Sequence, residues 1–214
     1  MKHLGKTAAL SSLIVFNLIS SISLSDAHKP KPKLLQVPII RQSTPYSCGA
    51  AALQAVLFYW QVSSEGEFAL HEPLQTDKEN GTHPISILNY AKNLGLKAEL
   101  KTQSSASDIE AAVDRKEPVI VDYQAWGYPE NKDYSAVWDS GHYGVIVGYD
   151  TDYFYLMDPF LSASYGKIGK NEFQNRWHDL ETRNGKLEYF VHSAIFISGF
   201  NSLKAFPSEI KNID

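Results

Sequence analysis

The stretch from Gln42 to Trp60 constrains the fold more than any other part of the chain, because it joins a polar loop to an apolar helix. Pro45 and Ser47 do not favour the continuation of a helix from upstream. The apolar residues that follow recur at three- and four-residue steps, which indicates a helix over 50–60 with one buried face: Ala52, Leu53, Val56, Leu57 and Trp60. We therefore expect a loop that turns into a buried helix.

Cys48, the only cysteine of the chain, falls at or near the first turn of this helix. Unpaired backbone N–H groups at a helix start carry a partial positive charge, which stabilises a thiolate. Gly49 leaves space beside the sulfur for a substrate or another backbone. The side-chain amide of Gln42 and the N–H of Cys48 are candidate donors to the oxyanion of an attacked carbonyl. The alternative is a small buried cysteine in the core, and this stretch alone favours neither.

The N-terminus has the pattern of a secretory signal peptide. Lys2 and Lys6 precede an apolar run over 10–24, and residues 25–27 are small at the two positions that a signal peptidase reads. A transmembrane helix is disfavoured because the run is short and rich in serine. We expect cleavage after Ala27, a secreted or periplasmic protein, and no stable membrane anchor afterwards. A lone thiol in an oxidising compartment is expected to be reactive or deeply buried.

The rest of the chain is expected to form one domain. We place a proline-spaced, charged linker at 28–35, the domain at 36–200 and a polar tail at 201–214. Loss of residues 1–27 leaves 187 residues and takes the formal net charge from −4 to −5. That length suffices for a sizeable core, and the mildly acidic charge without a basic run argues against nucleic acid as a partner. Neither a cofactor nor a metal is expected, because the sequence has no phosphate loop, no paired cysteines and no histidines at metal-ligand spacing.

Periodicity predicts the remaining elements. We expect strands over 34–40, 96–100, 119–121 and 187–198, a helix from Pro84 to a Gly95 cap, a helix opened by a Ser107–Glu110 capping box, and a short helix over 170–177. Two long loops are predicted, one at 61–82 that contains a short helical piece and one at 124–140. The second is aromatic, and it is either a wall of a substrate cleft or a satellite hydrophobic cluster: Trp126, Tyr128, Tyr134 and Trp138.

Residues 142–149 and 153–157 predict a hairpin with its turn at 150–152. If the hairpin is centred on Thr151, Asp158 opposes Gly144 and lies diagonal to His142 on the same face, within reach of it. A register change of one residue would separate the two side chains. We expect Gly144 to leave room for them to meet. The rival carboxylates are Asp139, on a loop, and Asp150 and Asp152, at the far end of the hairpin.

A thiolate nucleophile requires a base, and the base requires an orienting group. Cys48, His142 and Asp158 supply these in chain order. Three segments together resemble the bacteriocin-processing, double-glycine leader peptidases of the C39 family and their stand-alone relatives, over about residues 37–198: Gln42 with Cys48-Gly49, Gly141-His142 through Gly148-Tyr149-Asp150, and Asp158-Pro159.

This resemblance implies an α+β, papain-like cysteine peptidase fold, in which a helical part with the catalytic cysteine packs on an antiparallel sheet. It implies Cys48 as nucleophile, His142 as base and then acid, Asp158 as orienter and Gln42 as oxyanion donor. We expect a peptide or protein substrate to contact Gly49, Trp126, Trp138 and Gly141. A double-glycine leader is not assumed as that substrate, because the sequence has no transporter segment and no nucleotide-binding motif.

Two other functions remain open. The same residues would serve a related acyl transfer on amides, such as amidase or transglutaminase chemistry. A papain-like scaffold could also bind a peptide or protein at its aromatic loop without cutting it. The presence of all four candidate residues favours the enzyme. The sequence assigns no oligomeric state.

Overall fold

The computed structural model describes residues 32–126, 133–183 and 185–204. The expected signal peptide at 1–27 lies outside the described residues, as do Tyr128 and most of the expected tail. No helix among the described residues is both long and apolar enough to cross a bilayer.

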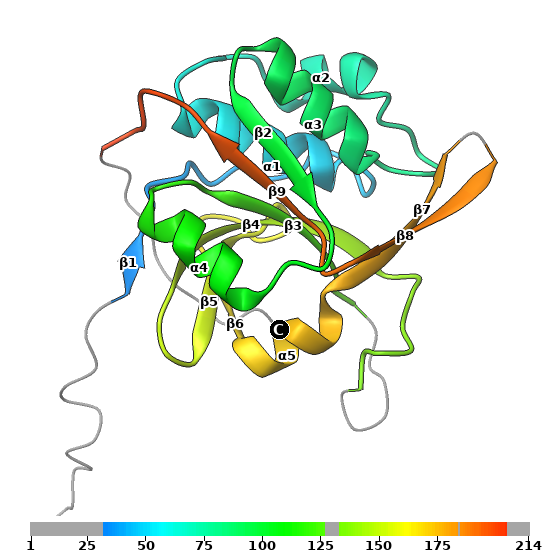
Figure 1. The fold of residues 1–214 in the computed structure, drawn as a ribbon. Helices are drawn as coiled ribbons and strands as arrows, with labels where there is room; N and C mark the ends of the chain where they lie inside the picture. Colours follow the sequence, from blue (N-terminus) through cyan, green and yellow to red (C-terminus); the bar gives the residue numbers. More distant parts are fainter. Residues whose placement is uncertain (1–31, 127–132, 184, 205–214) are drawn as a thin grey trace, which may run out of the picture. The chain divides into compact units, whose positions relative to one another are not determined.

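The described residues form an antiparallel sheet of seven strands and a separate two-stranded sheet (Figure 1). The seven-stranded sheet has the order β2-β9-β3-β4-β5-β6, with β1 paired to β4, and β7 pairs with β8. The strands are β1 (Lys33–Leu34), β2 (Lys97–Lys101), β3 (Val119–Gln124), β4 (Gly141–Tyr149), β5 (Tyr153–Met157), β6 (Gly166–Gly169), β7 (His178–Arg183), β8 (Lys186–Val191) and β9 (Ala194–Ser198).

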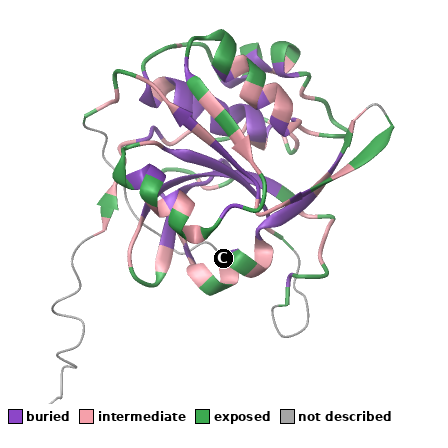
Figure 2. Ribbon diagram, viewed as in Figure 1, coloured by how far each residue is buried: buried purple, intermediate pink, exposed green. Residues whose placement is uncertain are grey.

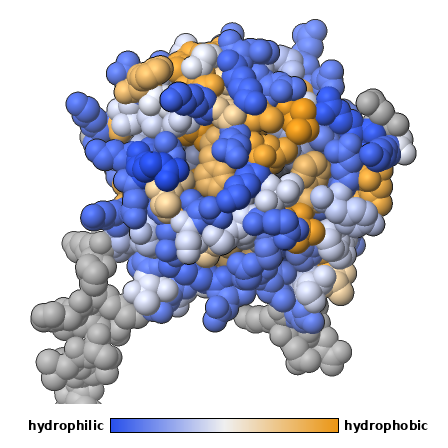
Figure 3. All heavy atoms as spheres, in the orientation of Figure 1, coloured by the Kyte–Doolittle hydropathy of each residue, from blue (hydrophilic) through white to orange (hydrophobic). Residues whose placement is uncertain are grey.

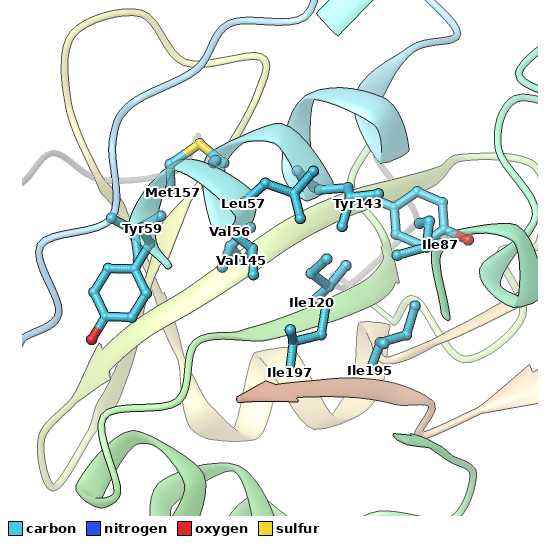
Figure 4. Close-up of a cluster of buried hydrophobic side chains, with 14 of the residues drawn as sticks. Val56, Leu57, Tyr59, Ile87, Ile120, Tyr143, Val145, Met157, Ile195 and Ile197 are labelled. Atoms are coloured by element: carbon cyan, nitrogen blue, oxygen red, sulfur yellow. The ribbon is translucent and has the colours of Figure 1, made fainter. Parts of the chain in front are cut away.

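Helices cover both faces of the large sheet (Figure 1). They are α1 (Cys48–Tyr59), α2 (Glu67–Leu74), α3 (Pro84–Asn93), α4 (Ala106–Asp114) and α5 (Lys170–Arg176). Side chains alternate between the faces of a strand. In β4, Val145 and Val147 therefore join the core under α1, α2 and α3, while Ile146 joins the core under α4 and α5. Figure 4 shows side chains of the first core, and Figure 2 shows the central strands of the sheet as the buried layer.

The helix after Cys48 is buried more completely than its sequence pattern predicts. A single buried face was expected, yet all but Cys48 and Phe58 of the helix α1 are buried. The helix packs between β4 on one side and α2 and α3 on the other. Its alanines, four of them between Ala50 and Ala55, let these neighbours approach closely, and this is why small residues stand where a polar face would otherwise be expected.

The predicted start and end of α3 are confirmed. Pro84 occupies the first helical position, where its missing N–H is not needed, and Gly95 follows the helix with φ of +82°. The predicted capping box at Ser107 and Glu110 is wrong. The box lies two residues earlier, where Ser105 caps the N–H of Asp108 and the Asp108 carboxylate accepts the N–H of Ser105.

The predicted strand over 34–40 is wrong beyond its first residue, because β1 ends at Leu34. Pro38 lacks the N–H that a ladder requires. The segment is held instead by the hydroxyl of Tyr165, which donates to the carbonyls of Leu35 and Val37.

The predicted single strand over 187–198 is also wrong. The backbone turns at His192, whose φ is +48°, and the chain divides into β8 and β9 in different sheets. The Trp177 indole donates to the Ser193 carbonyl across this break. The strand β8 pairs with β7, which the sequence pattern did not predict, so Leu187 and Tyr189 are exposed.

A hollow of about 590 Å³ lies between α4 and the strands β2 and β9, and it contains none of the candidate residues. In the view of Figure 3, hydrophobic residues gather around β2 and β9 within a mostly hydrophilic surface. The candidate catalytic residues lie elsewhere: Gln42 in the loop before α1, Cys48 at the start of α1, His142 at the start of β4 and Asp158 directly after β5.

Candidate active site

Cys48 is the first residue of α1, as predicted, and its side chain is partly exposed. The loop before it is held at two points. The N–H of Gln42 donates to the Pro159 carbonyl at 2.9 Å, which ties the loop to the segment after β5. The N–H of Ser43 donates to the Glu67 carboxylate on α2 at 2.7 Å. These bonds hold the loop before Cys48 to the segment after β5 and to α2.

Glu67 anchors the cysteine loop, and sequence reasoning missed it. Burial raises the pKa of Glu67, but hydrogen bonds from Ser47, His71 and Ser43 outweigh burial and hold the pKa below its ordinary value. The carboxylate therefore stays charged at neutral pH and keeps its donors. No local pattern marks Glu67, because it begins an eight-residue helix inside a stretch that shows no periodicity.

The hairpin register predicted around Thr151 is right near the candidate site and wrong near the turn. The pairs nearest the site are the predicted ones, whereas the pairs beyond a bulge between Ile146 and Gly148 are shifted by one residue. The two sets are Val145↔Met157 with Ile146↔Leu156, and Gly148↔Tyr155 with Tyr149↔Phe154. The predicted diagonal between His142 and Asp158 is thus preserved.

The structure brings His142 and Asp158 together. Nε2 of His142 lies 2.8 Å from Oδ1 of Asp158, and both side chains are buried. Asp158 is fixed by two further donors, since the N–H of Phe160 donates to Oδ1 at 2.7 Å and the hydroxyl of Tyr123 donates to Oδ2 at 2.7 Å. The carboxylate therefore has one orientation, and it sets the orientation of the imidazole.

The two groups shift each other's pKa in opposite directions. Burial lowers the pKa of His142, but the charge and hydrogen bond of Asp158, with a contribution from Cys48, raise it to about 10. Burial raises the pKa of Asp158, but His142 and the donors from Phe160 and Tyr123 bring it below its ordinary value. At neutral pH the pair is an imidazolium and a carboxylate.

Nδ1, the second nitrogen of His142, is not the one that contacts Asp158. It is buried and has no aligned hydrogen-bond partner among the described residues. The Cys48 side chain nevertheless lies close enough to raise the pKa of His142 by hydrogen bonding and by charge. We interpret this as a thiol that lies beside the ring but is not aligned for a hydrogen bond to it. Such geometry is common in unliganded sites.

Gln42 lies beside this arrangement, but its amide is partly engaged. Nε2 donates to the Thr44 carbonyl at 2.8 Å, and Oε1 is buried with no hydrogen-bond partner among the described residues. An amide nitrogen carries two hydrogens, so one remains for an oxyanion. The N–H of Cys48, at the first helical position, has no acceptor within the helix.

The sequence profile of the Peptidase_C39 like family matches residues 34–184 of this chain. The chain belongs to this family. No curated protein matches the sequence. Three solved structures that it resembles show the fold and are distant in sequence.

A putative C39-like peptidase from Bacillus anthracis has 18% identity and a TM-score of 0.61, over 81% of this chain and 100% of that chain. A double glycine motif protease from an AMS/PCAT transporter, solved with the leader peptide, has 21% identity and a TM-score of 0.55, over 79% and 98%. The peptidase domain of Streptococcus ComA, a bifunctional ABC transporter of a quorum-sensing pathway, has 24% identity and a TM-score of 0.54, over 75% and 97%. The predicted α+β, papain-like fold is confirmed.

Tyr123 is a further residue of the C39-like site that sequence reasoning missed. It lies on β3 opposite His142 in the strand pairing, and its ring meets the imidazole edge to face at a centroid distance of 5.8 Å. Burial and the charge of Asp158 raise the pKa of Tyr123 well above its ordinary value, so its hydroxyl stays a donor. A Cβ on Gly144 would lie 3.3 Å from this ring. The space at Gly144 is filled by Leu156, 3.1 Å from such a Cβ, and by Tyr123, so the expectation that it leaves room for His142 and Asp158 is wrong.

The two predicted tryptophans lie against different parts of the C39-like site. The Trp126 ring is 4.6 Å from that of His142 and 5.5 Å from that of Phe160, and Trp126 is 41% exposed. Trp138 instead packs against His178, with the ring centroids 4.3 Å apart and the ring planes tilted by 50°. Trp126 thus lies against the imidazole, and Trp138 lines a cavity that Cys48 also lines.

The two predicted glycines of the C39-like site permit close approaches that are already made. A Cβ on Gly49 would lie 2.7 Å from Cβ of Thr82, so the space there is filled and is not open to a substrate. A Cβ on Gly141 would lie 2.0 Å from Oδ2 of Asp179. Gly141, Cys48 and Trp138 line a cavity of about 330 Å³, while Gly49 and Trp126 do not.

Proposed function

We propose that this chain is a cysteine peptidase that cleaves a peptide bond through a thioester. The observation that carries the proposal is the buried 2.8 Å contact between His142 and Asp158, with the Cys48 side chain close enough to contribute to the raised pKa of His142. A thiol, an imidazole and an oriented carboxylate in this sequence of contacts are what acyl transfer by cysteine requires. Membership of the C39-like family supports a peptide as the partner.

The chemistry follows from the placement of the three groups. The Cys48 sulfur attacks the peptide carbonyl carbon, and the negative charge on the carbonyl oxygen is met by the N–H of Cys48 and the amide of Gln42. The C–N bond breaks as His142 gives its proton to the leaving amine, which leaves a thioester. His142 then takes a proton from water, the hydroxide attacks the acyl carbon, and the C–S bond breaks to restore the thiolate. Asp158 holds the imidazole in one orientation throughout.

A peptide library tests the proposal without knowledge of the natural substrate. We expect the purified chain to generate new peptide termini, detected by mass spectrometry, and Cys48→Ala to generate none. His142→Ala is expected to lower the rate by about 10²–10⁴-fold, and Gln42→Ala by about 10²–10³-fold if the amide stabilises the oxyanion. Cleavage that persists in Cys48→Ala, or no cleavage and no acylation of Cys48 by any peptide, would refute the proposal.

A peptide-binding module without catalysis is the second candidate. It is favoured by the exposed Trp126–Phe160 pair beside His142, which offers an aromatic surface that the catalytic steps do not require. On this reading Cys48→Ala would retain both peptide binding and biological activity. Loss of biological activity in that variant, with peptide binding retained, selects the peptidase.

We further propose that the protein is exported. The proposal rests on the signal-peptide pattern of residues 1–27 and on the lone cysteine, which has no internal partner for a disulfide. Mass spectrometry of the protein recovered from its own cells is expected to show an N-terminus at residue 28. A cytoplasmic protein with residues 1–27 intact would contradict export and leave the peptidase proposal unaffected.

A further inference from the structure

The cavity beside Cys48 contains a group of buried carboxyls that the proposed catalytic steps do not use. Asp122 on β3 is 3% exposed, and Asp179 and Glu181 on β7 are 6% and 9% exposed. One oxygen from each lies within 4.8 Å of the others, and all three residues line the cavity. Asp179 and Glu181 stand at alternate positions of their strand, so they share a face.

These carboxyls are only partly satisfied by the protein. Oδ1 of Asp179 accepts a 2.8 Å hydrogen bond from the amide of Gln124. Both oxygens of Asp122 are buried and have no donor among the described residues. Asp122 and Asp179 can therefore attract each other only if one of the two carboxyls is protonated. Burial, with the repulsion of its neighbours, raises the pKa of Asp122 well above its ordinary value and that of Glu181 to about 8.

A second and independent group points into the same cavity. Tyr143, on β4, is 4% exposed, lines the cavity, and its hydroxyl has no hydrogen-bond partner among the described residues. In Figure 4 its ring lies at one end of the labelled core side chains, with the hydroxyl at the outer end. Burial and the charges of Asp122, Glu181 and Asp179 raise the pKa of Tyr143, so the hydroxyl is neutral. Buried polar groups without partners are rare, and each requires an explanation such as a bound water, ion or ligand.

The shape of the cavity indicates what kind of cation would satisfy these groups. Its volume of about 330 Å³ is within the range of small-molecule pockets and many times the roughly 30 Å³ share of a single water. A lone metal ion would leave most of it unused. Trp138 lines the same cavity as the carboxyls, and an alkyl or guanidinium group can pack against its ring. The nucleophile Cys48 lines the same cavity.

Lys78 does not fill this role within the chain. It is exposed among the lining residues, and no ion pair joins it to a carboxylate of the described residues.

We propose that this cavity binds a basic side chain, lysine or arginine, of a peptide whose scissile bond lies within two residues of it. The inference deepens the proposed function and rests on it, since the peptide must be held while Cys48 attacks. An extended peptide advances about 3.3 Å per residue, so a side chain in a cavity lined by the nucleophile itself belongs to a residue next to the scissile bond or the one beyond.

Matched covalent probes test this inference. The probes are pairs of peptidyl acyloxymethyl ketones, and the two members of a pair differ only in having lysine or norleucine at one position. One pair varies the first residue before the ketone, and a second pair varies the second residue. The Cys48 sulfur forms a C–S bond to the methylene carbon as the carboxylate leaves with the C–O electron pair. We expect the lysine probe to label Cys48 at least about tenfold faster, as a charge-assisted hydrogen bond would give, and the ratio to fall toward one in Glu181→Gln and in Asp122→Asn.

Glu188→Gln is the matched control, because Glu188 is paired with Glu181 across the β7–β8 hairpin and does not line the cavity. It should keep the preference for lysine. Equal labelling by both probes overturns the inference and leaves the proposed peptidase intact. The inference is also overturned if calorimetry with Ca²⁺ or Mg²⁺ shows one tightly bound ion that is lost in Glu181→Gln, because the cluster would then be a metal site.

Failure of the proposed function gives a different result. In that case neither probe labels Cys48, although iodoacetamide still does. Binding of N-acetyl-lysine amide against N-acetyl-norleucine amide, followed by NMR of the Trp138 indole, then decides the cavity's preference by itself, and equal binding of the two overturns it.

Discussion

Tyr123→Phe removes one hydroxyl and leaves the packing of the ring in place. That hydroxyl donates to Oδ2 of Asp158 at 2.7 Å, and both groups are buried. A buried hydrogen bond to a charged group contributes about 1.5–3 kcal/mol, because its loss leaves a charged oxygen without a donor. We therefore expect the free energy of unfolding at pH 7 to fall by about 2 kcal/mol. For a domain of this length the melting temperature falls by roughly 4–8 °C.

The loss should depend on pH with a definite sign. The folded state holds the pKa of Asp158 below its ordinary value of 3.8, so the stability that this carboxylate contributes is present above about pH 3.8 and is lost as pH falls through the lower, folded value. Tyr123 supplies one of the causes of that shift. The difference in stability between wild type and Tyr123→Phe is therefore largest near neutral pH and shrinks below pH 3.8.

Tyr155→Phe is the matched control. Tyr155 also donates to an aspartate of the same hairpin at 2.7 Å, but to Asp150 near the turn. Urea unfolding at several pH values gives the stabilities, and the rate of Cys48 alkylation gives the effect on the site. Both variants are expected to lose stability, and only Tyr123→Phe to slow alkylation. Equal alkylation rates in the two variants, or a loss of stability in Tyr123→Phe that is the same at pH 3 and pH 7, would refute the role assigned to Tyr123.

Two predictions concern the acidic cavity. Gly141→Ala would place a methyl group 2.0 Å from Oδ2 of Asp179. We expect the free energy of unfolding, measured by heat or urea, to fall by about 1–3 kcal/mol. An unchanged stability would contradict this prediction and would mean that Asp179 moves freely. The stability of Glu181→Gln relative to wild type should be greater at pH 8 than at pH 5. The folded pKa of Glu181, about 8, lies above its ordinary value of 4.5. The stability that this group contributes to the wild type is therefore full below pH 4.5 and is lost as pH rises through 8. Melting curves at the two pH values measure this, and a difference independent of pH would contradict it.

The part of the site that depends on local pattern could be predicted from the sequence. The helix after Cys48, the two strands of the hairpin and the turn between them each have their own periodicity or turn residues. Together they placed Asp158 within reach of His142. The register was right only from the bulge to the site, because a bulge leaves no mark in the alternation of buried residues on β4.

The rest could not be predicted, because it depends on contacts between distant parts of the chain. Tyr123 meets an aspartate 35 residues away, and the Gln124 amide meets Asp179, which is 55 residues away. The strand β7 carries two acidic residues of the cavity and reads as a polar segment, so nothing local indicates a strand. The turn at His192 requires a positive φ at a residue other than glycine, which the sequence does not signal.

The most direct test of the proposed thiol–imidazole pair is the rate at which limiting iodoacetamide alkylates Cys48 at about pH 6, followed by intact mass spectrometry in wild type and His142→Ala. We predict rapid single alkylation in wild type and its loss in the variant, because an imidazole held by Asp158 beside the sulfur would activate it as a nucleophile. Slow alkylation in both proteins would show a structural thiol without an activating partner, and would contradict the proposed catalytic role of Cys48.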